Sequence, residues 1–186
     1  MKPKLLIVAG NSLKFKEISL VLNKFFDCEQ KSLPGYQEIQ GTSESILLHK
    51  MEAAYEAFKT PVLVDDTSVH FESLNGFPGP YIKDFISHIP VYEMGVKFAG
   101  SRIRISCWLG FHDGVQESII AEGSISGDIV KPKDIDPGVR EFDLFVQVDG
   151  TDRPMIEFTP EEKNKFSHRG KAMKNLIEKL QLKNPA

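Results

Sequence analysis

Residues 4–26 have the sequence KLLIVAGNSLKFKEISLVLNKFF. The apolar run Leu5–Ala9 is short, partly β-branched and stopped by Gly10, which predicts a buried strand over residues 4–9. Beyond the Gly-Asn turn, apolar side chains recur every three or four residues as far as Phe26, which is the spacing of one helix face. The stretch is therefore predicted to form a strand, a tight turn and a helix, an opening typical of α/β proteins.

The rest of the chain continues this alternation of helices and apolar strands. A hairpin comes later, because Asp113-Gly114 is a turn sequence between two runs with strand periodicity. Alternation followed by a hairpin predicts an α/β fold with a mixed sheet. Strands are expected over residues 28–32, 61–64 and 102–110, with a return strand to residue 125. Loops are expected over residues 75–80, where the chain is shaped by Gly and Pro, and over residues 131–138, where it is polar. Helices are expected over residues 42–58 and 81–89, from Thr159, and in a last segment that carries Met173, Leu176, Ile177 and Leu180.

Length and composition narrow the class of protein. A chain of 186 residues predicts one domain over residues 1–186, and 41% hydrophobic residues are too many for a disordered chain. The net charge is −3, whereas a protein that binds nucleic-acid backbone is normally strongly basic. We therefore expect no nucleic-acid partner.

Cellular location is predicted from what the sequence lacks. The longest apolar run is Leu5–Ala9, far short of the roughly 20 residues that cross a bilayer, and it is also too short for a signal peptide. Two cysteines, Cys28 and Cys107, cannot build a disulfide framework. We expect a soluble, reduced, cytoplasmic protein without a membrane partner.

The turn between the first strand and the first helix offers groups that suit a phosphate. A helix N-terminus presents unpaired N–H groups and a partial positive charge. Gly10 allows close approach, Asn11 and Ser12 add hydrogen bonds, and Lys14 adds a charge. Taken alone, the motif is more typical of a plain strand-to-helix turn capped by Asn11 or Ser12.

An acidic pair, Asp65-Asp66, follows the apolar strand 61–64. Adjacent carboxylates at the end of a buried strand are costly unless a metal or another cation compensates them. Mg²⁺ suits them because it takes hard oxygen ligands, and one carboxylate could hold the ion while the other activates water. An alternative stays open, in which one Asp caps the next turn and the other is solvated.

The segment Glu162–Arg169 gathers cations and a histidine at the junction of two helices. Such groups suit phosphates or the edge of a nucleobase. The commoner meaning of such a run is a solvated basic helix end.

Each of these motifs alone is weak evidence of a function, but five segments in this order form a specific pattern. Together they resemble the inosine triphosphate pyrophosphatase family, and the resemblance spans nearly the whole chain. The matching segments are Gly10-Asn11 with Lys14 and Glu17, PVLVDDT (residues 61–67), LNGFPGPYIK (residues 74–83), SGDIV (residues 126–130), and Glu162-Lys163-Asn164 with Ser167-His168-Arg169.

The resemblance implies an elongated α/β fold with a long mixed sheet, flanking helices and two lobes around a nucleotide cleft, usually as a homodimer. It implies hydrolysis of nucleoside triphosphates to monophosphate and pyrophosphate with Mg²⁺, with preference for non-standard purines such as ITP, dITP and XTP. Asp65 and Asp66 would hold Mg²⁺, and Asp66 would be the general base. The residues implied to bind the substrate are Gly10, Asn11, Ser12, Lys14, Lys50, Thr67, Lys83, Phe142, Asp143, Lys163, His168 and Arg169.

Three departures from the family pattern concern the same site. Ala9 stands where a Thr is usual, and Gly35 stands where a Glu often helps to bind metal, although Glu38 is close. Arg140-Glu141 replaces the Phe-Gly pair of the base-binding loop. The alternative is therefore a divergent nucleotide-binding homologue with altered base specificity or lost catalysis, against which the retained acidic pair argues.

Overall fold

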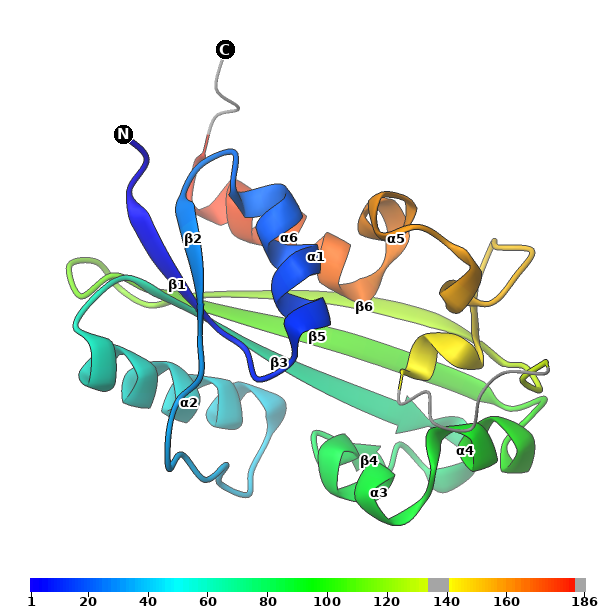
Figure 1. Ribbon diagram of the computed structural model, residues 1–186. Helices are drawn as coiled ribbons and strands as arrows, with labels where there is room; N and C mark the ends of the chain where they lie inside the picture. Colours follow the sequence, from blue (N-terminus) through cyan, green and yellow to red (C-terminus); the bar gives the residue numbers. More distant parts are fainter. Residues whose placement is uncertain (134–140, 183–186) are drawn as a thin grey trace.

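One mixed β-sheet organises the protein (Figure 1). The structure, a computed structural model, describes residues 1–133 and 141–182. In these residues the sheet has seven strands in the order β2-β1-β3-β5-β6-β7, and β4 pairs with β3. Strand β1 is parallel to β2 and β3, and the other pairings are antiparallel. The strands are β1 (Lys4–Val8), β2 (Asp27–Lys31), β3 (Val62–Phe71), β4 (Pro78–Gly79), β5 (Arg102–His112), β6 (Ile119–Ile129) and β7 (Val146–Val148).

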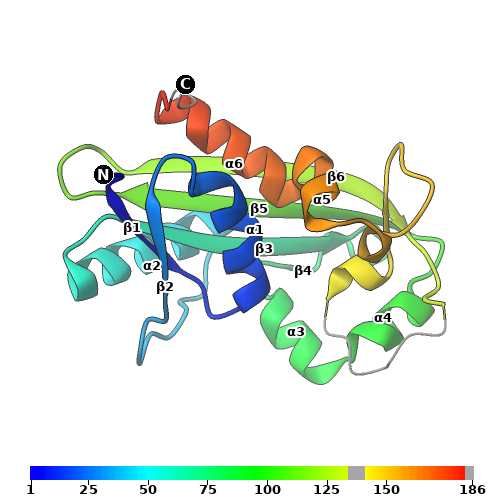
Figure 2. The same cartoon turned by 45° about the horizontal axis from the view of Figure 1, so that its top comes forward.

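Helices flank the sheet, so the predicted elongated α/β fold with a mixed sheet is confirmed (Figure 2). The α-helices are α1 (Ser12–Leu22), α2 (Ser43–Phe58), α3 (Ile82–His88), α4 (Val91–Lys97), α5 (Pro160–Phe166) and α6 (His168–Lys179). Single 3₁₀ turns lie at Glu72–Leu74, Phe142–Leu144 and Met155–Glu157. None of the helices in the described part of the chain has the length and apolar character that a membrane span requires.

The core on one face of the sheet is divided into two groups. Near one end, α1 and α6 pack on β3 through Leu63, whereas α3 and α4 pack toward the other end around Val69 and Phe71. Residues of odd number in β3 share this face, because side chains alternate along a strand. Asp65 and Thr67 therefore lie between the two groups, where the apolar row is interrupted. Helix α2 covers the opposite face through a third group that includes Val62 and Val64.

The structure corrects two features of the predicted fold. Strand β3 does not end at residue 64 but continues to Phe71, because it pairs with β5 over ten consecutive residues. The acidic pair thus lies within a strand. Helix α4 and strand β7 were not predicted, since each is short and its apolar residues are buried by distant parts of the chain. The predicted polar loop over residues 131–138 falls largely outside the described residues.

Helix α6 lies close against β6, and this contact fixes the position of the junction between α5 and α6. A Cβ at Gly123 would come within 2.2 Å of the Ala172 nitrogen and 2.3 Å of the His168 oxygen, so only glycine permits this approach. Strand β7 pairs only with residues 127–129 of β6. Along the rest of its outer edge, the backbone carbonyls of β6 accept hydrogen bonds from side chains of α6, and no strand of the described residues pairs there. The three bonds are Lys171 Nζ to the Ser124 carbonyl (3.1 Å), Asn175 Nδ2 to the Glu122 carbonyl (2.7 Å) and Lys179 Nζ to the Ile120 carbonyl (2.6 Å).

The regular spacing of these bonds has a geometric cause. Four residues of helix rise about 6 Å, and two residues of strand rise about 6.6 Å. Donors four apart on α6 therefore match carbonyls two apart on β6. The pairing satisfies an edge that would otherwise be open to another strand.

We expect Gly123→Ala to lower the free energy of unfolding by about 1–3 kcal/mol, because the added methyl group pushes α6 away from β6. Denaturant melts measure the change. Gly10→Ala is the control, since no neighbouring heavy atom lies within 4 Å of a Cβ there and its stability should change by less than about 0.5 kcal/mol. Equal stability of the two variants would contradict the close packing at Gly123.

Candidate functional site

The two carboxylates of the acidic pair point to opposite faces of the sheet. Both belong to β3, and neighbouring side chains of a strand alternate between its faces. Asp65 faces Cys107 and α6, whereas Asp66 shares its face with Ser68, whose hydroxyl contacts Ser43 of α2 at 2.6 Å. The pair therefore forms two separate environments.

The Asp65 carboxylate is surrounded by donors. Its side chain is 1% exposed and forms ion pairs with Lys14 and with Arg169, whose Nε lies 3.2 Å from Oδ2. The Cys107 thiol donates to the same oxygen at 3.2 Å. Burial alone would raise the pKa of Asp65, but Lys14 and Arg169 outweigh it and hold this pKa well below its usual range.

Arg169 connects this carboxylate to two further groups. Its Nη1 pairs with Glu17 of α1, and its Nη2 donates to Thr67 Oγ1 at 3.4 Å. Lys14 Nζ donates to the same hydroxyl at 3.2 Å. Since a hydroxyl has two acceptor positions and one proton, Thr67 accepts from both cations and keeps its proton for another acceptor.

Asp66 lies in a different environment. It is 8% exposed, and its Oδ2 is buried without a hydrogen-bond partner in the described residues. Burial raises the pKa of Asp66 to about 6, and Lys50 and Lys14 act in the opposite direction. Lys50 Nζ donates to the Asp65 carbonyl at 2.8 Å and lies 3.7 Å from Glu38 Oε1, so a lysine and a second carboxylate accompany Asp66.

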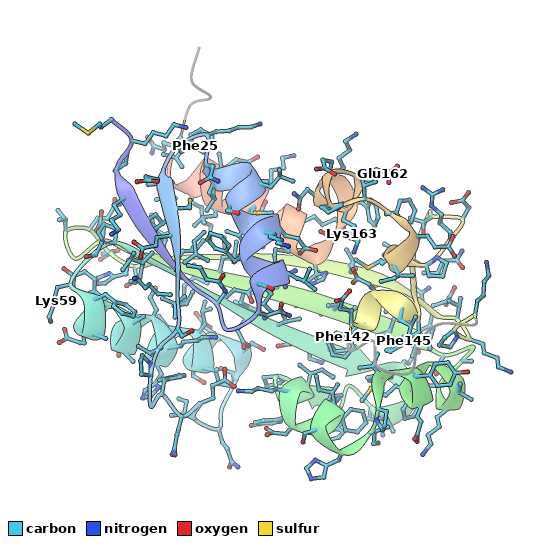
Figure 3. The ribbon with its side chains drawn as sticks, viewed as in Figure 1. Phe25, Lys59, Phe142, Phe145, Glu162 and Lys163 are labelled. Atoms are coloured by element: carbon cyan, nitrogen blue, oxygen red, sulfur yellow. The ribbon has the colours of Figure 1, made fainter. Side chains whose placement is uncertain are left out.

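Lys163 and Asp143, both among the residues implied to bind the substrate, come together away from the contacts of Asp65. Lys163 of α5 pairs with Asp143 of the 3₁₀ turn 142–144, and both side chains are mostly buried. Figure 3 shows Lys163 and Phe142 on neighbouring segments at the end of the sheet opposite to Lys59. The rings of Phe142 and Phe145 meet edge to face with centroids 6.2 Å apart.

His168 is the first residue of α6 and is 6% exposed. Burial and the charge of Arg169 hold its pKa well below the usual value, so the imidazole is neutral near pH 7. Its Nδ1 is buried without a partner among the described residues. A buried, unbonded ring nitrogen is a group that a ligand can satisfy.

Two other predicted groups lie apart from the network around Asp65. Asn11 caps α1, accepting from the Leu13 N–H at 2.9 Å, and Gly10 and Ser12 are exposed at this turn. Lys83 is exposed on α3, without a described polar contact. The structure thus brings Lys14, but not Lys83, into contact with the acidic strand.

The residues that could hold a divalent ion are few. In residues 1–133 and 141–182, no three His, Cys, Asp or Glu side chains are grouped so that they could bind a metal by themselves. Asp66 Oδ2 is free, and Glu38 is the nearby second carboxylate. Such a pair fits an ion that takes its other ligands from water and substrate phosphates. Gly35 has φ +72°, a backbone conformation that a glutamate there would strain.

Sequence reasoning assigned no role to Glu17 or Cys107. Glu17 was part of a quoted motif, and its position three residues after Lys14 on α1 places both near Asp65 and Arg169. Cys107 lies on β5 opposite Thr67. Its spacing within an apolar strand gives no signal of a polar contact. Arg140, one of the predicted departures, lies outside the described residues.

Residues 5–179 match the Ham1 family. The chain belongs to this family. It is 34% identical over 182 residues to the inosine triphosphate pyrophosphatase of Batrachochytrium dendrobatidis, covering 95% of this chain and 93% of that protein. It is 33% identical over 173 residues to the inosine triphosphate pyrophosphatase of Schizosaccharomyces pombe, covering 89% and 88%.

Solved Ham1 structures share the fold. The Coxiella burnetii Ham1 protein gives a TM-score of 0.76 at 20% identity, covering 97% of this chain and 99% of that one. The Staphylococcus aureus Ham1 protein gives 0.70 at 22% identity, covering 96% and 98%. The predicted family, and with it the prediction of an enzyme, is confirmed. The roles of individual residues stay predictions.

The raised pKa of Asp66 predicts a pH-dependent stability. A protonated carboxyl is favoured in the folded state, so the contribution of Asp66 to stability falls as pH rises from about 4 to about 6 and is constant above. We expect Asp66→Asn, measured by thermal melts in metal-free buffer, to be more stable than the wild type at pH 7.5 by about 2 kcal/mol and equal to it near pH 4.

Asp65→Asn is the matched control, because the pKa of Asp65 is lowered. Its charge contributes stability above the pKa of the unfolded chain, so this variant should be less stable than the wild type at pH 7.5. The same sign of change in both variants would contradict the two environments.

Proposed function

We propose that this Ham1-family protein hydrolyses non-standard purine nucleoside triphosphates, such as ITP, dITP and XTP, to monophosphate and pyrophosphate. The family's relatives are named inosine triphosphate pyrophosphatases. The observation that carries the proposal for this chain is Asp66, a buried carboxylate with a free oxygen next to Lys50 and Glu38. Removal of such substrates would keep the nucleotide pool free of deaminated purines.

Asp66 has the properties of a general base. In the metal-free protein, a pKa of about 6 leaves Asp66 ionised at neutral pH, yet basic enough to accept a proton from water. Its free Oδ2 has no internal donor that would compete for the lone pair among the described residues. Asp66 would therefore orient the attacking water and take its proton.

Mg²⁺ is the proposed cofactor. Asp66 and Glu38 are the residues that would hold it, with Glu38 in place of the glutamate that the family carries at the position of Gly35. When bound, the ion lowers the pKa of its water and neutralises charge on the phosphates. Asp65, also predicted as a ligand, has both oxygens engaged by protein donors.

The triphosphate would be held by cations from several elements. Lys14 and Lys50 face the acidic strand, and the N–H groups of the Gly10–Ser12 turn add neutral donors. Thr67 has a hydroxyl proton to donate, as its acceptor positions are used by Lys14 and Arg169. Arg169 forms ion pairs with Asp65 of β3 and Glu17 of α1, and from there its guanidinium would face the phosphates beside Lys14.

The base would bind near the Lys163–Asp143 pair, with Phe142 as a stacking surface. A 6-oxo purine offers an acceptor where adenine offers an amino group. A protonated ring nitrogen of His168, Nδ1 or Nε2, that faces the 6-substituent of the purine would favour the 6-oxo base. We further propose that the protein is a cytoplasmic homodimer with no nucleic-acid or membrane partner. Light scattering tests the dimer.

A panel of ITP, XTP, dUTP and ATP with Mg²⁺ tests the reaction. We expect pyrophosphate as the first phosphorus product, with ITP and XTP preferred. Asp66→Asn should bind nucleotide but lower kcat by about 10²–10⁴-fold, as expected for loss of a positioned base. Orthophosphate as the first product would indicate another reaction class. Binding without turnover in the wild type would favour the alternative of a nucleotide-binding protein that has lost catalysis.

His168→Ala tests base recognition. We expect kcat/KM for ITP to fall about tenfold more than kcat/KM for ATP, because a 6-oxo group loses a donor and a 6-amino group does not. Lys165→Ala, which alters an exposed cation of α5, is the control and should affect both substrates alike. Equal losses with both nucleotides in His168→Ala would place this residue at the phosphates or the sugar.

A further inference from the structure

We infer that Asp65 is a positioning residue, which holds Lys14 and Arg169 for the phosphates and does not bind the metal. The inference rests on the proposed function. It gives the two members of the acidic pair different tasks, on opposite faces of one strand.

The contacts of Asp65 engage both of its oxygens and oppose binding of a metal ion. Oδ1 pairs with Lys14, and Oδ2 accepts from Arg169 Nε and from the Cys107 thiol. The side chain is 1% exposed. A divalent ion would have to displace one of these cations and would then be repelled by the other. Asp66, by contrast, keeps a buried oxygen with no donor in the described part of the chain.

The arrangement orders two flexible side chains before a ligand arrives. Lys14 comes from α1 and Arg169 from α6, so the cations reach Asp65 from elements 155 positions apart in the sequence (169 minus 14). Free lysine and arginine side chains have many rotamers, and this conformational entropy is lost when the side chains are fixed. Because Asp65 fixes them in the folded protein, the loss does not occur when substrate binds.

The cations that Asp65 holds both point to Thr67. Lys14 Nζ and Arg169 Nη2 lie 3.2 and 3.4 Å from Thr67 Oγ1. This hydroxyl lies between the two core groups of the face, next to Asp65 on the same side of β3. The three donors are therefore gathered at one point of the sheet. Without Asp65, Arg169 keeps only Glu17 as an ion-pair partner, and Lys14 keeps none among the described residues.

Removal of the Asp65 charge has two opposing effects on a triphosphate. The site becomes more positive, which favours binding of the ground state, whereas the cations lose their orientation, which disfavours the transition state. The signature of a positioning role is therefore a lower kcat with an unchanged or lower KM. Loss of a metal ligand would instead weaken metal binding, and a purely structural role would lower the melting temperature without changing kcat.

The first experiment measures Mn²⁺ binding by electron paramagnetic resonance, without nucleotide. We expect Asp66→Asn and Glu38→Gln to weaken Mn²⁺ binding by about tenfold or more. Asp65→Asn should change it by less than about threefold, because the Asp65 charge is already compensated by Lys14 and Arg169 on the other face of the strand. A tenfold loss in Asp65→Asn, or no loss in Asp66→Asn, overturns the inference. This result does not depend on hydrolysis, so it stands even if the wild type proves inactive toward ITP.

The second experiment measures ITP hydrolysis at saturating Mg²⁺. We expect Asp65→Asn to lower kcat by about 10–100-fold without raising KM, the scale of a small misplacement at a reacting centre. The loss of kcat in the double variant Lys14→Met/Asp65→Asn should be smaller than the product of the two single losses, because Asp65 acts in part through Lys14 and in part through Arg169. Additive losses, or a raised KM with normal kcat, overturn the positioning role.

A conservative variant covers the case in which Asp65→Asn does not fold. Asp65→Glu keeps the charge, so it should keep Mn²⁺ affinity within about threefold and retain more of kcat than the double variant. Weak Mn²⁺ binding by Asp65→Glu, with a melting temperature equal to that of the wild type, overturns the inference.

Discussion

The buried charge of Asp65 is the constraint on which the site depends. A carboxylate that is 1% exposed is stable only if opposite charges and donors surround it. Lys14, Arg169 and Cys107 meet this requirement from α1, α6 and β5. The relative positions of two helices and two strands are thereby tied to one side chain, and so is the direction in which the cations face.

The fold prepares this place through the pattern of one strand. Along the face of β3 that α1 and α6 cover, Leu63 belongs to one core group and Val69 to the next. Asp65 and Thr67 interrupt the apolar row between them, so the two core groups cannot merge. Close approach of α6 at Gly123 then sets Arg169 at the interruption. The close packing at Gly123 therefore determines where the Arg169 guanidinium lies in the site.

Much of the fold was predictable from local sequence patterns, whereas the arrangement of the candidate site depends on pairing between distant segments. The first strand and helix were predicted because Leu5–Ala9 and the stripe behind it have unambiguous periods. The continuation of β3 through Asp65-Asp66-Thr67-Ser68 was missed, because Asp and Ser are poor strand formers and only the ladder with β5 keeps them extended. The consequence, carboxylates on opposite faces, was missed with it. No local signal relates Asp65 to Arg169, which are 104 residues apart.

In a protein of net charge −3, the cations of the candidate site are not an excess of positive charge. Each major cation of the site has a carboxylate partner: Lys14 has Asp65, Arg169 has Asp65 and Glu17, Lys163 has Asp143, and Lys50 lies near Glu38. Before a ligand binds, the cluster is therefore close to neutral, and it exerts little long-range attraction on anions in general. A triphosphate with a bound divalent cation has less net negative charge than a bare triphosphate, so it fits a nearly neutral site better. Under the proposed function, selectivity for a metal-loaded nucleotide would rest on this internal pairing rather than on an excess of positive charge.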